Sequence, residues 1–327
     1  MKTLNKIKTP FIIGPTATGK TSLAVKLAKK FNGEIISVDS RQVYKGMDLG
    51  TGKDIEEYGL GDDKVNYHLI DVVEPNHEYN LFEFVNDVYN AFNEIISNNK
   101  TPFFSGGSAL YLNAILKGYK LKGNPPNKEI REKYNNLNAK EIIADLNINY
   151  PSIIPHIKEP ENKNRILRVI ENINTSCEVS NSITDMIEPL VLGVYFPRET
   201  VWKRIRERLI ARINSGLIEE VERLHNEGVS WERLDFFGLE YRYVAQYLQG
   251  VLTKEEMTEK LYIKIRQFAK RQDIWYRKFE KEGIDIYWIK EGDFSEAENI
   301  LTAFLENQNL PTIDFRLYKT LYGPKSS

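Results

Sequence analysis

The sequence predicts a doubly wound parallel α/β sheet that is interrupted by a helical insertion. A short apolar run at 10–13 leads into a glycine-rich stretch, and a helical pattern at 22–30 follows, which is the order strand, loop, helix. Further strand and helix patterns alternate along the chain, as they do in parallel sheets with helices on both faces. Between residues 118 and 188 no strand pattern alternates with the helices, which indicates an inserted helical domain.

The glycine-rich stretch has the spacing of a phosphate-binding loop. It reads Gly14, Pro15, Thr16, Ala17, Thr18, Gly19, Lys20 and Thr21. Glycines allow the backbone to curl so that N–H groups point inward, and the following helix adds the positive end of its dipole. Lys20 is expected to reach the terminal phosphates, and the Thr21 hydroxyl is expected to bind Mg²⁺. The prediction is a P-loop NTPase-like core that binds a polyphosphate together with Mg²⁺.

The later strands are predicted from short β-branched apolar runs, and the helices from apolar residues three or four apart. Strands are expected at 10–13, 33–40, 67–73, 101–104, 190–196 and 284–289. Helices are expected at 22–30, 80–98, 109–116, 201–214, 254–279 and 295–307. A capping box of Thr253 and Glu256 marks the start of the long helix. The chain then divides into the first part of the core at 1–117, the helical insertion at 118–188, the return to the core with basic C-terminal helices at 189–310, and a tail at 311–327.

Composition limits the class of protein. The 327 residues are enough for two domains, and the net charge of -1 means that any nucleic acid must bind a local basic patch. The single cysteine, Cys177, excludes a disulfide framework, and the four histidines have no metal-binding spacing. The N-terminus lacks the apolar core of a signal peptide, and no apolar run approaches the length of a membrane span. We expect a cytoplasmic monomer without membrane contact.

Three polar groups are expected at the carboxyl edge of the sheet, where ligands of such folds bind. They are the phosphate loop after the first strand, Asp39 after the second and the Gly106-Gly107-Ser108 turn after the fourth. Asp39 is interpreted either as a helix cap or Mg²⁺ partner, or as a general base that deprotonates an acceptor. The turn is either only a tight turn, or it places a hydroxyl and bare backbone N–H groups against a substrate.

Basic residues gather in the long C-terminal helix. Between 260 and 278 the only acid is Asp273, and the cations are Lys260, Lys264, Arg266, Lys270, Arg271, Arg277 and Lys278. Such a run is either a solvated helix face or a surface for a polyanion, on which Trp275 and Tyr276 would stack with bases. The excess of cations in a near-neutral chain favours the polyanion. Further basic side chains are Lys203, Arg204, Arg206, Arg208 and Arg212 in a second stripe, and Arg165 and Arg168 in the insertion.

Together these motifs resemble the tRNA dimethylallyltransferase (isopentenyltransferase) family, from the phosphate loop to about residue 279. The phosphate loop is similar to the family's G-P-T-[AG]-[ST]-G-K-[ST]. The most specific block, D-S-R-Q-V-Y at 39–44 and M-D-L-G-T at 47–51, is similar to D-S-x-Q-[VIL]-Y-x-x-[ML]-D-I-G-T. Further similar segments are H-L-I-D at 68–71, G-G-S-A-L-Y at 106–111, N-R-I-L-R at 164–168 and K-R-Q-D-I-W-Y-R at 270–277. Ser108 stands where the family has Thr, which keeps the hydroxyl, and 238–242 follows the family's G-Y-[KR]-[EQ] only loosely.

The resemblance implies transfer of a dimethylallyl group from dimethylallyl diphosphate to N6 of the adenine next to the anticodon, position 37 of tRNA, with release of diphosphate. Asp39, Ser108 and Lys20 are then the catalytic residues, with Asp39 as the base. The diphosphate is expected on the phosphate loop, Arg204 and Arg208. The tRNA anticodon loop is expected to contact Asp39, Ser40, Arg41, Gln42, Ser108, Arg131, Asn164, Arg165, Ile166, Leu167, Arg168, Lys270, Arg271, Gln272, Trp275 and Arg277.

Other functions share part of this pattern. A P-loop nucleotide or small-molecule kinase explains an ATP-binding loop and Mg²⁺, but not the block at 39–51 or the basic helix. An adenylate isopentenyltransferase keeps the chemistry and changes the acceptor, whereas the insertion and the basic helix favour a large RNA. A GTP-dependent switch protein would need N-K-x-D for guanine, which is absent.

Overall fold

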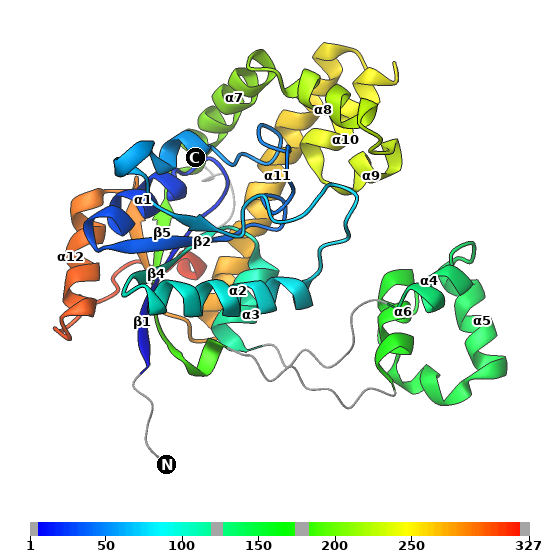
Figure 1. The fold of residues 1–327 in the computed structure, drawn as a ribbon, viewed down its shortest axis with the longest axis horizontal. Coiled ribbons are helices and arrows are strands. Elements are labelled where there is room, and N and C mark those ends of the chain that lie inside the picture. Colours follow the sequence, from blue (N-terminus) through cyan, green and yellow to red (C-terminus); the bar gives the residue numbers. More distant parts are fainter. Residues whose placement is uncertain (1–5, 119–126, 174–182, 321–327) are drawn as a thin grey trace. The chain divides into compact units, whose positions relative to one another are not determined.

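A six-stranded parallel sheet forms the centre of the first compact unit of the protein (Figure 1). The computed structural model describes residues 6–118, 127–173 and 183–320. Within them the strand order is β3-β2-β4-β1-β5-β6, and each neighbouring pair is parallel. The strands are β1 (Ile7–Ile13), β2 (Gly33–Val38), β3 (Tyr67–His68), β4 (Thr101–Gly106), β5 (Ile187–Tyr195) and β6 (Ile286–Lys290). The predicted parallel α/β sheet is confirmed.

Helices surround the sheet and continue beyond it. The α-helices of this unit are α1 (Lys20–Lys30), α2 (Leu81–Ser97), α3 (Ala109–Lys117), α7 (Arg198–Asn214), α8 (Leu217–Asn226), α9 (Trp231–Phe236), α10 (Leu239–Leu248), α11 (Lys254–Lys281) and α12 (Phe294–Leu305). The short 3₁₀ turns are η1 (Ile55–Tyr58), η2 (Gly61–Asp63), η4 (Ile183–Asp185) and η5 (Leu317–Lys319). The predicted capping box of Thr253 and Glu256 begins α11, whereas α8, α9 and α10 were not predicted. In the described parts of the chain, no helix combines the length and the apolar character that crossing a membrane requires.

Alternate strand residues face opposite layers of helices. In β1, Ile12 packs in one core with Leu23 of α1 and Leu301 of α12. Phe11 and Ile13 belong to another core, which contains residues of α2 and α3. The sheet is therefore doubly wound, and because its strands are buried on both faces, they are continuous apolar runs.

The register of the sheet brings three strand ends to one edge. Ile13 of β1 and Val38 of β2 both pair with Gly106 of β4. The loops after these strands therefore start beside one another at the carboxyl edge. A Cβ at Gly106 would lie 2.2 Å from the Val38 carbonyl oxygen, so this close approach requires glycine.

The third strand is shorter than predicted. β3 ends at His68, whereas the sequence predicted a strand over 67–73. Leu69 and Asp71 have φ of 62° and 56°, in the left-handed region that interrupts an extended strand. The chain after β3 instead forms backbone hydrogen bonds with loop 42–45.

Helices α7 to α11 enclose a further hydrophobic core, which anchors the loop after β2. This loop inserts the fully buried side chains of Val43 and Met47 into the core. Beside them the buried carboxylate of Glu220, on α8, accepts the hydroxyl of Tyr241 at 2.7 Å and three successive backbone N–H groups of the loop. These N–H groups, at 2.9, 2.8 and 3.0 Å, belong to Asp48, Leu49 and Gly50.

The same loop contains a buried lysine. Lys53 is 1% exposed, and its ammonium donates to the carbonyl of Tyr44 at 2.8 Å and to the carboxylates of Asp48, at 2.6 Å, and Asp71. A cation that is buried away from water needs such partners, because an unpaired buried charge destabilises the folded protein. Lys53 therefore joins the loop after β2 to the loop after β3.

The second compact unit, Gly118–Ser182, is helical in its described part. It contains α4 (Lys128–Lys133), α5 (Ala139–Asn149), η3 (Pro151–His156) and α6 (Lys163–Asn172). Its core contains Tyr134, Ile142, Leu146, Ile153, Ile166 and Leu167. The predicted insertion extends to residue 188, whereas this unit ends at Ser182 and η4 and β5 follow it. Cys177 lies outside the described residues.

The C-terminal segment binds to α11. The buried carboxylate of Glu280 accepts the N–H groups of Leu317 at 3.1 Å and Tyr318 at 2.9 Å. Arg277 donates to the carbonyl of Thr320 at 2.8 Å and to its hydroxyl at 2.7 Å. The guanidinium of Arg277, which the resemblance assigned to tRNA, therefore binds Thr320 of the protein's own C-terminal segment.

We predict that Glu220→Gln lowers the free energy of unfolding by about 2–3 kcal/mol, because an amide nitrogen cannot accept the loop N–H groups and leaves buried donors unsatisfied. Urea denaturation of both proteins measures the difference. Glu222→Gln on the exposed face of the same helix is the control and is expected to change stability by less than about 0.5 kcal/mol. Equal losses in the two variants would contradict the role of Glu220.

Candidate active site

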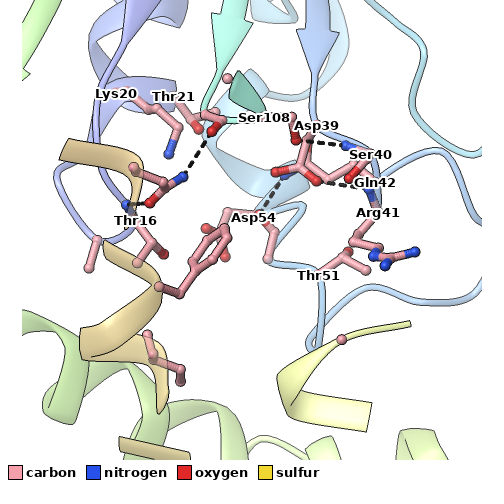
Figure 2. A pocket seen from close by; sticks show the side chains of 18 of the residues that line it. Thr16, Lys20, Thr21, Asp39, Ser40, Arg41, Gln42, Thr51, Asp54 and Ser108 are labelled. Carbon is pink, nitrogen blue, oxygen red and sulfur yellow. Dashed lines mark hydrogen bonds between the residues drawn. The ribbon is translucent and has the colours of Figure 1, made fainter. Parts of the chain in front are cut away.

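A pocket of about 920 Å³ lies at the carboxyl edge of the sheet, within the first unit. Its walls come from the phosphate loop, the ends of β2 and β4, and helices α7, α10 and α11. In Figure 2, Lys20 and Thr21 project from the phosphate-loop side. Asp39 and Ser40 project from the opposite side, with Ser108 between the two sides. The three polar groups that were predicted to meet at this edge therefore line one pocket.

The phosphate loop forms a tight curl. Ala17 and Gly19 have φ of 64° and 79°, so the chain turns back on itself before α1 begins at Lys20. Inside the curl, the Thr18 hydroxyl donates to a carbonyl of the loop at 2.9 Å. Lys20 and Thr21, the first helical residues, line the pocket, so the positive end of the helix dipole meets the cavity. This arrangement is suited to an anion.

Two arginines of α7 hold the loop from outside. Arg204 donates from Nε to the carbonyl of Ala17 at 2.7 Å, and Arg208 donates to the hydroxyl of Thr16. Burial and the neighbouring Arg212 lower the pKa of Arg208 to about 10. Both predicted arginines therefore lie at the phosphate loop and line the pocket.

The ammonium of Lys20 is buried near another cation, Arg208. Burial and the nearby Arg208 lower the pKa of Lys20 to about 8, although Asp39 favours the charged form. Lys20 is therefore protonated at neutral pH at a cost in free energy. A bound polyanion would relieve this cost because it neutralises the cluster.

Asp39 directly follows β2 and is half-buried in the pocket. Its carboxylate accepts the backbone N–H of Arg41 at 2.9 Å, and the chain continues as a turn, so Asp39 does not cap a helix. Burial raises the pKa of Asp39, while this hydrogen bond and the charge of Lys20 oppose the rise. A carboxylate with a raised pKa is a better proton acceptor than one in water, as a general base requires.

Ser108 joins the ends of β2 and β4 at the pocket wall. Its hydroxyl oxygen accepts the N–H of Ser40 at 3.1 Å, and its own N–H donates to the carbonyl of Val38 at 3.2 Å. The N–H of Ser108 is therefore not bare, which corrects that part of the interpretation of this turn. The hydroxyl itself lines the pocket.

Arg41 and Gln42 are bound within the protein. Arg41 donates to the carbonyl of Phe236 at 2.9 Å and lies 4.9 Å from the centre of its ring, and burial lowers the pKa of Arg41. The Gln42 amide accepts from the hydroxyl of Ser37 at 2.8 Å and donates to the carbonyl of Gly52 at 2.9 Å. Both ends of the Gln42 amide are therefore held by the protein, and each keeps capacity for one further hydrogen bond.

Helix α11 has an exposed and a buried face. Lys270 and Arg271 are exposed, and Trp275 is half-buried. Arg271 and Trp275 line the pocket. Gln272 and Tyr276 are buried on the other face, against the phosphate loop. Gln272, which was predicted to contact tRNA, is therefore buried at the pocket wall. The predicted stacking of Tyr276 on bases is corrected, because its side chain is fully buried.

In the second unit, Arg131 and Arg168 share one buried partner. Both pair with the carboxylate of Glu171, at 2.9 Å and 2.7 Å. The carboxylate thereby fixes both guanidiniums on neighbouring helices α4 and α6. Each side chain remains partly exposed, so it also presents charge to solvent.

Helix α6 exposes only part of the predicted N-R-I-L-R motif. Asn164 and Arg165 are exposed, whereas Ile166 and Leu167 are buried in the core of the unit. The predicted contact of tRNA with Ile166 and Leu167 is therefore corrected, because their side chains pack the helix against its own unit. Asn164 and Arg165 keep accessible side chains.

Several charged residues of the pocket were missed from the sequence. Asp54, Glu57 and Glu240 line it, and Asp54 pairs with Arg212 at 3.2 Å. Burial raises the pKa of Glu57 and of Glu240. One signal in the sequence could have pointed to Glu240, because segment 238–242 departs from the family pattern. These acids offset part of the positive charge around Lys20.

No three His, Cys, Asp or Glu side chains in the described ranges gather closely enough to hold a metal ion. The Thr21 hydroxyl lines the pocket at the start of α1. Mg²⁺ is commonly held by few protein groups together with substrate phosphates and water. The donors present fit an ion bound in that way, and Mg²⁺ stays a prediction.

Comparison with known proteins gives a consistent result. The family model described as "IPP transferase" matches residues 42–279, and that described as "Isopentenyl transferase" matches residues 7–65. The tRNA dimethylallyltransferase 2 of Treponema denticola is 47% identical over 85% of this chain and 94% of that protein. The tRNA dimethylallyltransferase 1 of Syntrophus aciditrophicus is 45% identical over 88% of this chain and 94% of that protein.

Solved structures agree with the sequence matches. The full-length tRNA isopentenylpyrophosphate transferase of Bacillus halodurans superposes with a TM-score of 0.66 and 28% identity, over 92% of this chain and 98% of that one. A eukaryotic dimethylallyltransferase that was captured acting on tRNA has a TM-score of 0.70 at 23% identity, which supports the fold. From the sequence matches, with the fold in agreement, we conclude that the chain belongs to the IPP transferase family.

Proposed function

We propose that this protein transfers a dimethylallyl group from dimethylallyl diphosphate to N6 of the adenine next to the anticodon, position 37 of tRNA, and releases diphosphate. The observation that carries the proposal is one pocket that holds a phosphate-binding loop and, across from it, the half-buried carboxylate of Asp39. The family relationship supports the same reaction, since the relatives are tRNA dimethylallyltransferases.

The donor would bind with its diphosphate on the phosphate loop. The loop N–H groups, Lys20, Arg204 and Arg208 would neutralise the negative charge that grows on the diphosphate as the allylic C–O bond breaks. Thr21 would hold Mg²⁺, which supplies further charge neutralisation at the same oxygens. The apolar side chains of Leu110, Phe268 and other residues in the pocket wall would exclude water from the allyl group.

The acceptor adenine would approach Asp39. In the transfer, the N6 nitrogen forms a bond to the allylic carbon, the C–O bond to diphosphate breaks, and one N6 proton passes to Asp39. The Ser108 hydroxyl, which is held beside Ser40, would orient the acceptor base or the bridging oxygen. The adenine must leave the stack of the anticodon loop to reach this position.

The RNA would be held by exposed cations and an aromatic ring. On the first unit, exposed Lys270 and Arg271 and half-buried Trp275 and Arg41 would contact the loop, and on the second, exposed Arg165 and partly exposed Arg131 and Arg168. We also propose that the protein is cytoplasmic and monomeric.

The test is transfer of label from dimethylallyl diphosphate, with Mg²⁺, to unmodified tRNA that has adenine after the anticodon. AMP and ADP serve as parallel acceptors. Label on tRNA alone supports the proposal. Label on the nucleotides alone would make the protein an adenylate isopentenyltransferase, and ATP consumption without label would indicate a kinase.

We predict that Asp39→Ala abolishes transfer and leaves binding of inorganic diphosphate within a few-fold of wild type, because the carboxylate acts on the acceptor. Asp39→Asn is the matched variant, since its amide oxygen keeps the bond to the Arg41 N–H. Single-turnover rates and calorimetric diphosphate binding measure the two effects. If both variants lost diphosphate binding as fully as transfer, Asp39 would not be the base.

We predict that affinity for inorganic diphosphate falls as the pH rises through about 8. The pKa of Lys20 is lowered to about 8, so above this pH the free protein loses the ammonium that the diphosphate needs. The same titration on Lys20→Met accounts for ionisation of the diphosphate itself. A pH dependence of equal steepness in both proteins would contradict the role of Lys20.

A further inference from the structure

Gln272 connects two loops at the wall of the pocket. It is on α11, 5% exposed, and both ends of its amide are used. Its oxygen accepts the N–H of Thr16, in the phosphate loop, at 2.9 Å. Its nitrogen donates to the carbonyl of Gly107, in the turn that carries Ser108, at 3.0 Å. One planar amide thus spans the donor loop and the acceptor-side turn.

The space around this amide is tightly filled. A Cβ at Gly107 would lie 2.5 Å from the Gln272 nitrogen and 3.2 Å from the carbonyl oxygen of Gly14. The turn therefore approaches both the amide and the phosphate loop closely, which only glycine allows. A shift of the amide would move one of these backbones.

Tyr276 supports the same loop one helical turn later. Its side chain is 0% exposed, and its hydroxyl donates to the carbonyl of Gly14 at 2.9 Å. Gln272 and Tyr276 are four residues apart, so they lie on the same face of α11. Helix α11 thereby fixes the phosphate loop at two points, Gly14 and Thr16.

The exposed charges lie beside this buried face of the helix. Lys270 and Arg271 immediately precede Gln272 in the sequence and are exposed. Gln272 itself is 5% exposed at the pocket wall, and its amide is held between Thr16 and Gly107, so RNA on the exposed face of α11 does not reach it. The assignment of Gln272 to tRNA contact by resemblance conflicts with this burial.

We infer that Gln272 is a positioning residue, which sets the separation between the diphosphate on the phosphate loop and the acceptor beside Ser108, and that it does not contact RNA. The inference rests on the proposed function. In a displacement reaction the reacting atoms must be aligned within a narrow range, and misplacement by about 1 Å costs about 10²-fold in rate. A rigid two-sided bond between the loops supplies such alignment.

The experiment compares Gln272→Met with Gln267→Met. Methionine matches glutamine in length and removes both hydrogen bonds, and Gln267 is an exposed glutamine of the same helix. Gln272→Met is expected to lower kcat by about 10- to 100-fold, with the KM for tRNA within twofold of wild type. Gln267→Met is expected to match wild type in both. Arg271→Ala is the reference for an RNA contact, with a raised KM for tRNA.

Two variants keep the test decisive if Gln272→Met does not fold. Gln272→Glu retains an acceptor for the Thr16 N–H and loses the donor to Gly107, and Tyr276→Phe loses only the bond to Gly14. Tyr276→Phe is expected to lower kcat less than Gln272→Met would, and Gln272→Glu at least as much, because its carboxylate faces the Gly107 carbonyl; the tRNA KM is expected to stay unchanged in both. Thermal unfolding of each variant establishes which of them are folded.

The inference is overturned if the folded Gln272 variants raise the KM for tRNA as Arg271→Ala does while kcat stays at the wild-type value, because Gln272 would then contact RNA. It is also overturned if kcat and KM both remain unchanged. Failure of the proposed function is distinct, since the wild-type protein would then transfer no label to tRNA, and the inference would fall with it.

Discussion

The common edge at which β1, β2 and β4 end is the constraint on which the rest of the site depends. The pairing of Ile13 and Val38 with Gly106 places the phosphate loop, Asp39 and the turn with Ser108 side by side. Because side chains alternate along each strand, a shift of one residue would turn the buried face outward and separate these groups. The two cores on either side of the sheet therefore determine the geometry of the pocket as well as the stability of the fold.

The ionisable side chains of this pocket are arranged in a way that favours the binding of substrates. Lys20 and Arg208 have pKa values lowered by burial, while burial raises the pKa of Asp39, Glu57 and Glu240. Both sets of shifts express a free-energy cost of holding charge in a cavity. A polyanion next to the cations and a polar base next to Asp39 would each reduce that cost. Perturbed pKa values of this kind cluster at functional sites.

Local sequence signals predicted the parts of the molecule that depend on short-range physics. Glycine spacing located the phosphate loop, apolar runs located five strands closely, and a capping box located the start of α11. The prediction of a strand over 67–73 was wrong beyond residue 68. The left-handed conformations of Leu69 and Asp71 are set by tertiary contacts, among them the bond from Lys53 to Asp71. The burial of Gln272 could not be predicted either. A glutamine between charged residues is typical of an exposed position, and only the packing of α11 against the phosphate loop buries it. Contacts between distant segments, such as Glu220 with the loop after β2, leave no pattern in either segment alone.

The buried ammonium of Lys53 makes the loop after β2 depend on the loop after β3. It donates to Asp48 and Asp71, so loss of the lysine alone would leave the two carboxylates without this shared cation. Arginine would not replace it directly, since a planar guanidinium is larger than a compact ammonium and the Lys53 side chain is fully buried. A substitution at Lys53 would therefore also disturb the pocket, because Gln42 donates to the carbonyl of Gly52, the residue before Lys53.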